Sequence, residues 1–236
     1  MTPRTLGILR SAAILLVASA SLIAVSGCDP RALAYFLQPF EPTIAPPGPS
    51  LDDKKIVILC NVTSGSLAEF PSLERDLTRE FATALKKKAK KLTVVDPDKV
   101  ATWVEAHPRW TEPADAARDF DADIVIFLEV EQFQVQAPGD LNVVHGDSKI
   151  HIIAYEMRYP TNSKDRPLKD QPKEAHDVYN DYAESSFPNR GPLPIDSGTS
   201  RSAFKNKFLK IVATEASWHF VEHAEDASIQ DSRIEK

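Results

Sequence analysis

The sequence predicts an α+β (mixed α/β) fold: a mixed sheet in the order β-α-β-α-α-β-β-(β)-α, with helices on one face. Short apolar runs alternate with amphipathic segments in the first half of the domain, which is typical of βα units with parallel strands. Two long segments, 123–136 and 149–159, predict an antiparallel hairpin. An apolar periodic segment at 202–223 predicts a closing helix.

The first βα unit starts at Lys55–Val62, whose short apolar run and branched residues favour a buried strand. Residues 71–91 follow as an amphipathic helix. Its apolar face is marked at four-residue intervals by Leu73, Leu77, Phe81 and Leu85. Its end carries Lys86, Lys87, Lys88, Lys90 and Lys91. Cations stabilise a helix carboxyl terminus, so we interpret the lysines as a solvated face, with an anion or lipid-headgroup site as the alternative.

The second βα unit starts with the strand Leu92–Val95. Asp96 and Pro97 then supply an N-cap and a first helical position. This helix ends before Pro108, and a further short helix is predicted at 113–120.

The segment 123–136 changes character along its length. Its first half is apolar throughout, as in a central strand, and its second half alternates. The apolar parity changes between Val130 and Phe133, which predicts a bulge. Residues 160–200 are rich in Pro, Ser, Asp and Asn and predict a long loop, within which 176–186 are a candidate third strand.

The amino terminus has the organisation of a secretory leader. Residues 1–27 hold Arg4, Arg10, no acid and an apolar stretch too short to span a membrane comfortably. The leader ends in Val25-Ser26-Gly27-Cys28, which resembles the bacterial lipobox. The resemblance implies removal of residues 1–27 and lipidation of Cys28 with fatty acyl chains such as palmitate. Two or more acyl chains anchor a protein stably to a membrane.

Residues 28–53 are expected to form a lipidated tether, because their prolines prevent a continuous helix or strand. The apolar patch 32–40 within it can lie on the bilayer or pack on the domain. We expect an extracytoplasmic protein on the periplasmic side of a bacterial membrane. Asp29 resembles an inner-membrane retention signal, and the choice between inner and outer membrane stays open. One domain is expected at 54–223, followed by a disordered polar tail at 224–236.

The charge balance argues against nucleic acid as a partner. The chain carries a net charge of −6, and loss of the two leader arginines would leave about −8. There are two cysteines. If Cys28 is lipidated, Cys60 has no partner for a disulfide. Its apolar surroundings indicate a small buried residue rather than a reactive thiol.

Three clusters have residue types that can support chemistry. His219, Glu222 and His223 match the H-x-x-E-H zinc-peptidase pattern, but they lie at the end of the last predicted helix, and a third ligand is not evident. Two further groups are interpreted as polar turns and strand ends: His145, Asp147 and His151, and Asp119, Asp121 and Asp123. No glycine-rich nucleotide motif is present. We therefore assign no catalytic, metal or cofactor residue.

The order of these elements resembles the TolB amino-terminal domain, the fold of CsgG-type and LpoB-type lipoproteins. The resemblance covers 54–223 and rests on the Leu-Thr-Val-Val-Asp strand, the Ala122-Asp123 strand start and the long hairpin. It implies an envelope scaffold, pore former or regulator rather than a catalyst, and it carries no functional residue to this chain. The proline-rich region 160–200 departs from the family pattern.

The sequence thus predicts a lipid-anchored, non-enzymatic scaffold or adaptor of the cell envelope that contacts a partner protein. A sheet edge or the 160–200 segment would provide the contact. Two alternatives stay open: a hydrolase or metal-dependent enzyme whose site the sequence does not reveal, and a small-molecule or glycan-binding module.

Overall fold

A computed structural model describes residues 42–136, 139–140, 142–162, 164–189, 191–195 and 200–224. All of them except Pro42 belong to one compact unit that starts at Thr43. The predicted leader, Cys28, the patch 32–40 and residues 225–236 lie outside the described residues.

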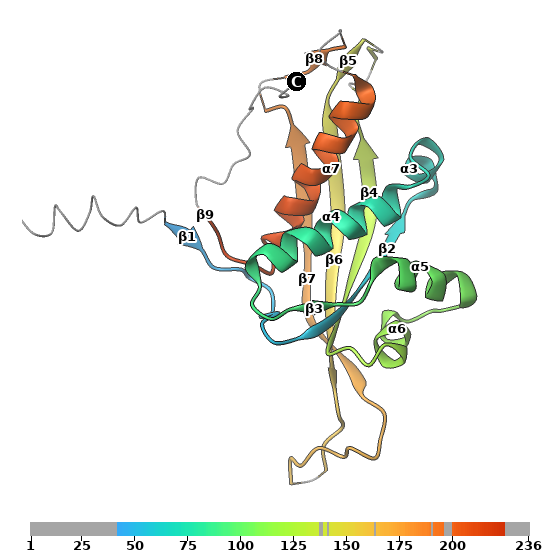
Figure 1. Ribbon diagram of the computed structural model, residues 1–236, viewed down its shortest axis with the longest axis vertical. Coiled ribbons are helices and arrows are strands. Elements are labelled where there is room, and N and C mark those ends of the chain that lie inside the picture. The colour runs from blue at the N-terminus through green and yellow to red at the C-terminus, as the bar shows by residue number, and fades with distance from the viewer. Residues whose placement is uncertain are drawn as a thin grey trace, which may run out of the picture. The chain divides into compact units, whose positions relative to one another are not determined.

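A five-stranded mixed sheet forms the centre of this unit, in the order β3-β2-β4-β6-β7 (Figure 1). Strand β2 is parallel to β3 and β4, whereas β4, β6 and β7 are mutually antiparallel. The strands are β2 (Lys55–Val62), β3 (Thr93–Val94), β4 (Ile124–Gln134), β6 (Gly146–Arg158) and β7 (Glu174–Phe187). The predicted α+β class, the parallel βα units and the long hairpin are confirmed.

Five helices and two small sheets complete the described fold. The helices are α3 (Ser64–Glu69), α4 (Leu73–Lys88), α5 (Pro97–Ala106), α6 (Pro113–Asp119) and α7 (Arg201–Ser217). The small sheets pair β1 (Thr43–Ile44) with β9 (His223–Ala224), and β5 (Val143–Val144) with β8 (Leu193–Pro194). Helix α3 and the four short strands were not predicted, because each is too short to show a period.

The prediction that helices cover one face of the sheet is wrong. Helices α4 and α7 pack on one face, and α5 and α6 pack on the other. Figure 1 shows α4 and α7 crossing in front of the sheet. The reason is that β2 and the first half of β4 are apolar on both faces, and each face has to be covered.

The face under α4 and α7 holds the larger core. Phe81, Phe204 and Phe208 are completely buried there. A Cβ added to Gly146 would lie 2.5 Å from the Phe208 ring, so the ring packs directly on the β6 backbone. The other face packs Val57, Val125 and Ile153 against Val100, Trp103 and the α6 alanines.

Two local predictions are confirmed by the backbone. The Asp96 side chain accepts a hydrogen bond from the Asp98 amide at 3.0 Å, and Pro97 is the first residue of α5. The β4–β6 register shifts between Val130 and Gln132, which is the predicted bulge. A second register shift lies in the β6–β7 pairing, between Ala154 and Tyr155 of β6.

The fold begins about ten residues before the predicted boundary at residue 54. Leu51 is 1% exposed and belongs to the main core. Gly48 donates its amide hydrogen to the carbonyl oxygen of His219 at 2.8 Å. Residues 43–53 are therefore structured, although their prolines exclude a helix or long strand.

The closing helix is shorter than predicted. It ends at Ser217 rather than at His223, and turns follow before β9. Phe220 and Val221 lie beyond the helix end and are buried. Their apolar side chains therefore continued the pattern of the helix in the sequence, although the helix itself does not continue. The segment 160–200 also differs from a long loop, because the candidate third strand within it is β7, with fourteen residues.

Candidate interaction surface

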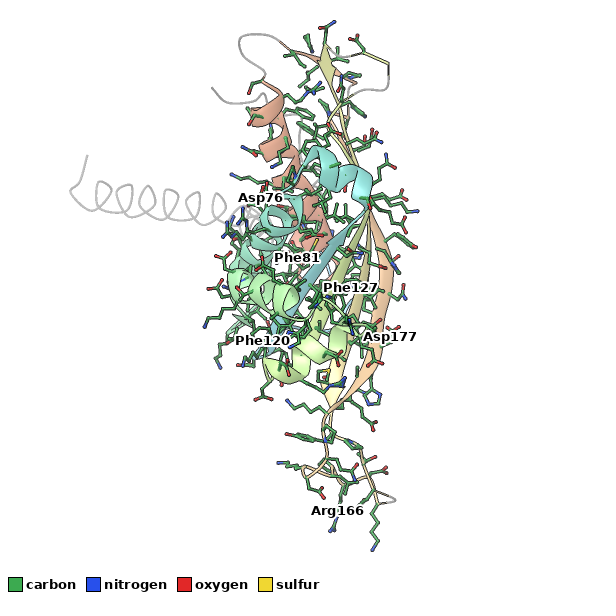
Figure 2. All side chains as sticks on the ribbon, turned by 90° about the vertical axis from the view of Figure 1, so that its right-hand side faces the viewer. Asp76, Phe81, Phe120, Phe127, Arg166 and Asp177 are labelled. Carbon is green, nitrogen blue, oxygen red and sulfur yellow. The ribbon has the colours of Figure 1, made fainter. Side chains whose placement is uncertain are left out.

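Helices α5 and α6 leave much of their side of the sheet uncovered. Figure 2 shows them against the middle of the sheet, with β7 along its rim and Arg166 far from the helices, on the connection between β6 and β7. Beyond these helices the sheet carries polar side chains. We name this set the open face: Glu129, Glu131, Lys149, His151, Asn180 and Tyr182.

His151 is the centre of the open face. Its Nδ1 lies 3.1 Å from Oε2 of Glu129 on β4, and its Nε2 lies 2.8 Å from Oδ1 of Asn180 on β7. The hydrogen bond to Asn180, followed by that to Glu129, raises the pKa of the imidazole above its ordinary value. Both partner atoms are acceptors, so the protonated ring, with two N–H groups, satisfies both at once.

Tyr182 is the most exposed ring of the open face, with 43% of the residue accessible. Its ring stacks on His151 and lies 4.5 Å below Nζ of Lys149. Lys149 is itself held by Glu131 at 3.3 Å, and this hydrogen bond raises the pKa of the lysine. Three strands thus hold one exposed tyrosine in a fixed orientation, which lowers the entropy cost of a contact made through it.

No described strand pairs with the outer edge of β7. The amide hydrogen of Tyr182 bonds to Oδ1 of Asp181 at 2.8 Å, from which we infer that it points away from β6. Opposed residues of antiparallel strands alternate between bonded and non-bonded pairs. The backbones of Asn180, Glu184 and Ser186 therefore face outward as well.

A groove of about 460 Å³ runs along this edge, and we name it the edge groove. One wall is formed by residues of β7, and the other by the end of α7 with the following turn. It is lined by Tyr182, Ala183, Glu184, Ser186, Asn189, Glu215, Trp218 and His219. Burial raises the pKa of the Glu215 carboxyl.

The edge is acidic. Strand β7 contains four carboxylates and neither lysine nor arginine: Glu174, Asp177, Asp181 and Glu184. Charged side chains and a bulge protect a free edge against pairing with an identical strand, because like charges would face one another. The same charges favour an extended segment that carries cations.

A short chain of hydrogen bonds on the other side of β7 connects the strand to the turn that follows α7. The Tyr179 hydroxyl bonds to Nδ1 of His219 and lies 3.3 Å from Oδ2 of Asp181. Burial raises the pKa of Tyr179 to about 12, and burial lowers the pKa of His219 below its ordinary value. Both groups are therefore neutral near pH 7, and they fix one wall of the edge groove.

The H-x-x-E-H residues do not form the geometry of a zinc peptidase. That geometry needs both histidines on one helix face. His219 follows the end of α7, and His223 lies in β9 with its ring stacked on Trp218 at 4.6 Å. Within the part of the chain that the structure describes, no group of three or more His, Cys, Asp or Glu side chains is placed to hold a metal ion.

His145, Asp147 and His151 are only partly brought together. His145 Nε2 lies 3.5 Å from Asp147 and 3.3 Å from the hydroxyl of Ser186, whereas His151 bonds elsewhere. A hydrolytic triad needs the acid and the nucleophile at opposite nitrogens of the ring. Here both approach the same nitrogen, so these residues are not arranged as a relay.

The three aspartates before β4 each have a structural partner. Asp119 accepts from the Trp103 indole at 2.7 Å, Asp121 binds Lys173 at 3.1 Å, and Asp123 accepts from the Lys55 amide at 2.9 Å. These contacts fit the interpretation as strand ends rather than a cation site.

The lysine run and Cys60 have different surroundings. Lys91 pairs with Asp53 at 3.3 Å, while Lys86, Lys87 and Lys88 form the last turn of α4. Cys60 is a free cysteine of β2 that lies partly buried beside α4, and burial raises the pKa of its thiol. An inert thiol is therefore expected at Cys60.

Sequence reasoning missed the open face. Its residues come from three strands, and two register shifts decide which of them meet. The alternation of 149–159 predicted that His151 lies on one face of its strand, but it could not predict the partners on the neighbouring strands, Glu129 and Asn180.

Among the described residues, no helix combines the length and apolar character needed to cross a membrane. No protein-family model and no curated protein matches the sequence.

Solved structures with a partly similar arrangement include two bacterial proteins. The PelC dodecamer from Paraburkholderia phytofirmans is 12% identical, with 74% of this chain and 94% of that chain covered, at a TM-score of 0.36. The lipoprotein GNA1162 from Neisseria meningitidis is 12% identical, with 72% and 99% covered, at a TM-score of 0.37. The resemblance to TolB-type domains stays a prediction.

Proposed function

We propose that this protein is a lipid-anchored, extracytoplasmic adaptor without catalytic activity, which binds an extended cationic segment of a partner protein at the outer edge of β7. The observation that carries the proposal is the free edge of β7 with its outward backbone groups and its row of carboxylates. An added strand would gain main-chain hydrogen bonds from the edge and charge pairing from the acids.

The open face supports the same contact. Tyr182 lies on the edge strand and belongs to both the open face and the edge groove. Exposed, immobilised tyrosines are frequent anchors of protein interfaces. A strand paired with β7 would place its side chains beside this ring.

Peptide binding tests the edge directly. A short peptide of alternating Thr and Val with added lysines is titrated against the protein by fluorescence anisotropy, beside a peptide with glutamates at the same positions. A third peptide has the lysines and N-methyl groups along one edge. The lysine peptide is expected to bind, and the other two are expected to fail.

Two variants at one position separate main-chain pairing from charge. Glu184→Pro removes an outward amide hydrogen that β6 does not use, a position where edge strands tolerate proline. Glu184→Gln keeps that hydrogen and removes one charge. We expect Glu184→Pro to abolish binding and Glu184→Gln to weaken it in a salt-dependent way. Unchanged binding by a folded Glu184→Pro protein would refute the proposal.

A second copy of the chain is the competing occupant. The connection between β6 and β7 carries basic side chains that could meet an acidic edge: Lys164, Arg166, Lys169 and Lys173. Light scattering decides between the two, since an adaptor stays monomeric at micromolar concentration. A stable oligomer that Glu184→Pro dissociates would assign the edge to self-assembly instead.

The anchor has its own test. Cells that express the full chain are labelled with a palmitate analogue, and Cys28→Ser is the control. We expect the label in the membrane fraction of the wild-type protein and its loss in the variant.

A further inference from the structure

A second cavity, of about 560 Å³, lies between α5, α6 and the residues that connect them. Its volume is within the range of small-molecule sites. Its lining combines aromatic rings, Trp103, His107 and Trp110, with charged side chains, Arg109, Asp115, Arg118 and Asp119. The edge strand β7 contributes nothing to this lining, so the cavity is a separate site.

The rings of this cavity are held in place. The Trp103 indole donates its N–H to Asp119, and His107 stacks on Trp103 with 4.6 Å between ring centroids. Trp110 meets Phe127 edge to face at 5.9 Å. Ring walls that are already fixed lose little conformational entropy when a ligand binds.

His107 presents an acceptor. Its Nδ1 lies 2.8 Å from the main-chain oxygen of Trp103. A carbonyl oxygen only accepts hydrogen bonds, so Nδ1 of the neutral ring carries the hydrogen and Nε2 is left as an acceptor. Such an atom suits a ligand hydroxyl.

The charges leave one group uncommitted. Asp115 binds Arg118 at 2.8 Å, and Asp119 is held by Trp103. Arg109 has no hydrogen bond or ion pair with any residue in the described ranges. A free guanidinium at the cavity favours a carboxylate, which it binds through two parallel hydrogen bonds.

We propose that this cavity binds a saccharide unit that carries a carboxylate, of the hexuronate class. The apolar face of the sugar ring lies against Trp110, the more exposed indole, because Trp103 is buried and its ring is stacked on His107. The carboxylate of the sugar pairs with Arg109. The hydroxyls of the sugar donate to Nε2 of His107 and to the remaining lone pairs of Asp115 and Asp119. These acceptors favour a polyhydroxylated ring over a flat aromatic acid.

Calorimetry on the full chain in detergent tests this site, with three probes: trigalacturonate, neutral trigalactose and benzoate. Arg109→Gln removes the proposed carboxylate partner. Arg79→Gln is the matched control, because Arg79 already binds Asp98 at 2.6 Å and neither residue lines this cavity. Quenching of indole fluorescence is followed in parallel, and it should persist in Trp218→Phe, since Trp218 lies outside this cavity.

We expect trigalacturonate to bind, Arg109→Gln to weaken it roughly ten- to hundredfold, and Arg79→Gln to leave it unchanged. Trigalactose should bind the wild-type protein as weakly as trigalacturonate binds Arg109→Gln. The proposal is overturned if trigalacturonate does not bind, if both sugars bind equally, if Arg109→Gln has no effect, or if benzoate matches trigalacturonate. Glu184→Pro should not change any of these affinities, so this test and that of the adaptor function fail independently.

Discussion

The imidazole of His151 lies nearly parallel to the ring of Tyr182, with 4.6 Å between centroids and 15° between planes. The two residues face each other across β6 and β7 at a pair whose backbones do not hydrogen-bond, where opposed side chains approach most closely. This contact links a titratable group to the exposed ring beside the edge groove.

The stability of the open face should depend on pH through His151. Its pKa is raised in the folded protein, so its stabilising contribution is complete below pH 6.5 and is lost as the pH rises through the folded-state pKa. Urea unfolding of the wild-type protein and of His151→Gln at pH 6 and pH 8 measures this. The stability difference between the two proteins should be larger at the lower pH.

A nuclear magnetic resonance titration of the His151 ring provides the independent check. A midpoint at or below the ordinary value of 6.5 would contradict the hydrogen bonds to Asn180 and Glu129 described above.

His219 should have the opposite effect. Burial lowers its pKa, so the folded state favours the neutral ring, and stability is lost as the pH falls below 6.5 toward the lowered value. His219→Gln should remove this acid-side loss. Tyr179→Phe removes the hydroxyl bonded to His219, and it shows how much of the stability comes from this hydrogen bond alone. A His219 midpoint above 6.5 would show that the fold stabilises the charged ring, which contradicts the lowered pKa.

The contact between Gly146 and Phe208 should restrict substitution on β6. A Cβ at Gly146 would meet the buried ring, so Gly146→Ala should lower the free energy of unfolding by about 1–3 kcal/mol. Gly65→Ala is the control without a steric contact, because nothing lies within 4 Å of its added Cβ, and in helix α3 it should leave stability unchanged or raise it. Denaturant unfolding distinguishes them, and equal stabilities would show that Phe208 does not pack on the strand backbone.

The segment before β2 should contribute to stability. Leu51 is buried in the main core, so Leu51→Ala should cost about 2–5 kcal/mol. Leu193 is only partly buried, so Leu193→Ala should lower the free energy of unfolding by less than Leu51→Ala does. Wild-type stability of Leu51→Ala would mean that the domain begins at residue 54, as the prolines suggested.

Local patterns predicted the elements that have a clear period. The four-residue spacing of Leu73, Leu77, Phe81 and Leu85 predicted α4, and the parity change after Val130 predicted the bulge in β4. Helices on both faces could also have been predicted, because the run Ile56–Leu59 is apolar on both sides of the strand.

The rest depends on which segments meet across the sheet. The carboxylates of 174–187 are compatible with an edge strand, but they do not establish one, because an edge is defined by the absence of a neighbour. The grouping of Glu129, His151 and Asn180 requires the register of three strands. The H-x-x-E-H pattern did not predict a metal site for a related reason. Its two histidines share one helix face only if the helix continues through them, and α7 ends at Ser217.

Site-specific photocrosslinking in intact cells tests the adaptor account most directly. A photoreactive side chain replaces Glu184 at the outward edge of β7, and a second protein has it at Lys88, at the end of α4. The account predicts one discrete adduct with another protein from Glu184, lost when Ser186→Pro removes a neighbouring outward amide hydrogen, and no such adduct from Lys88. Adducts that are equal at both positions, or an edge that crosslinks to nothing, would contradict it.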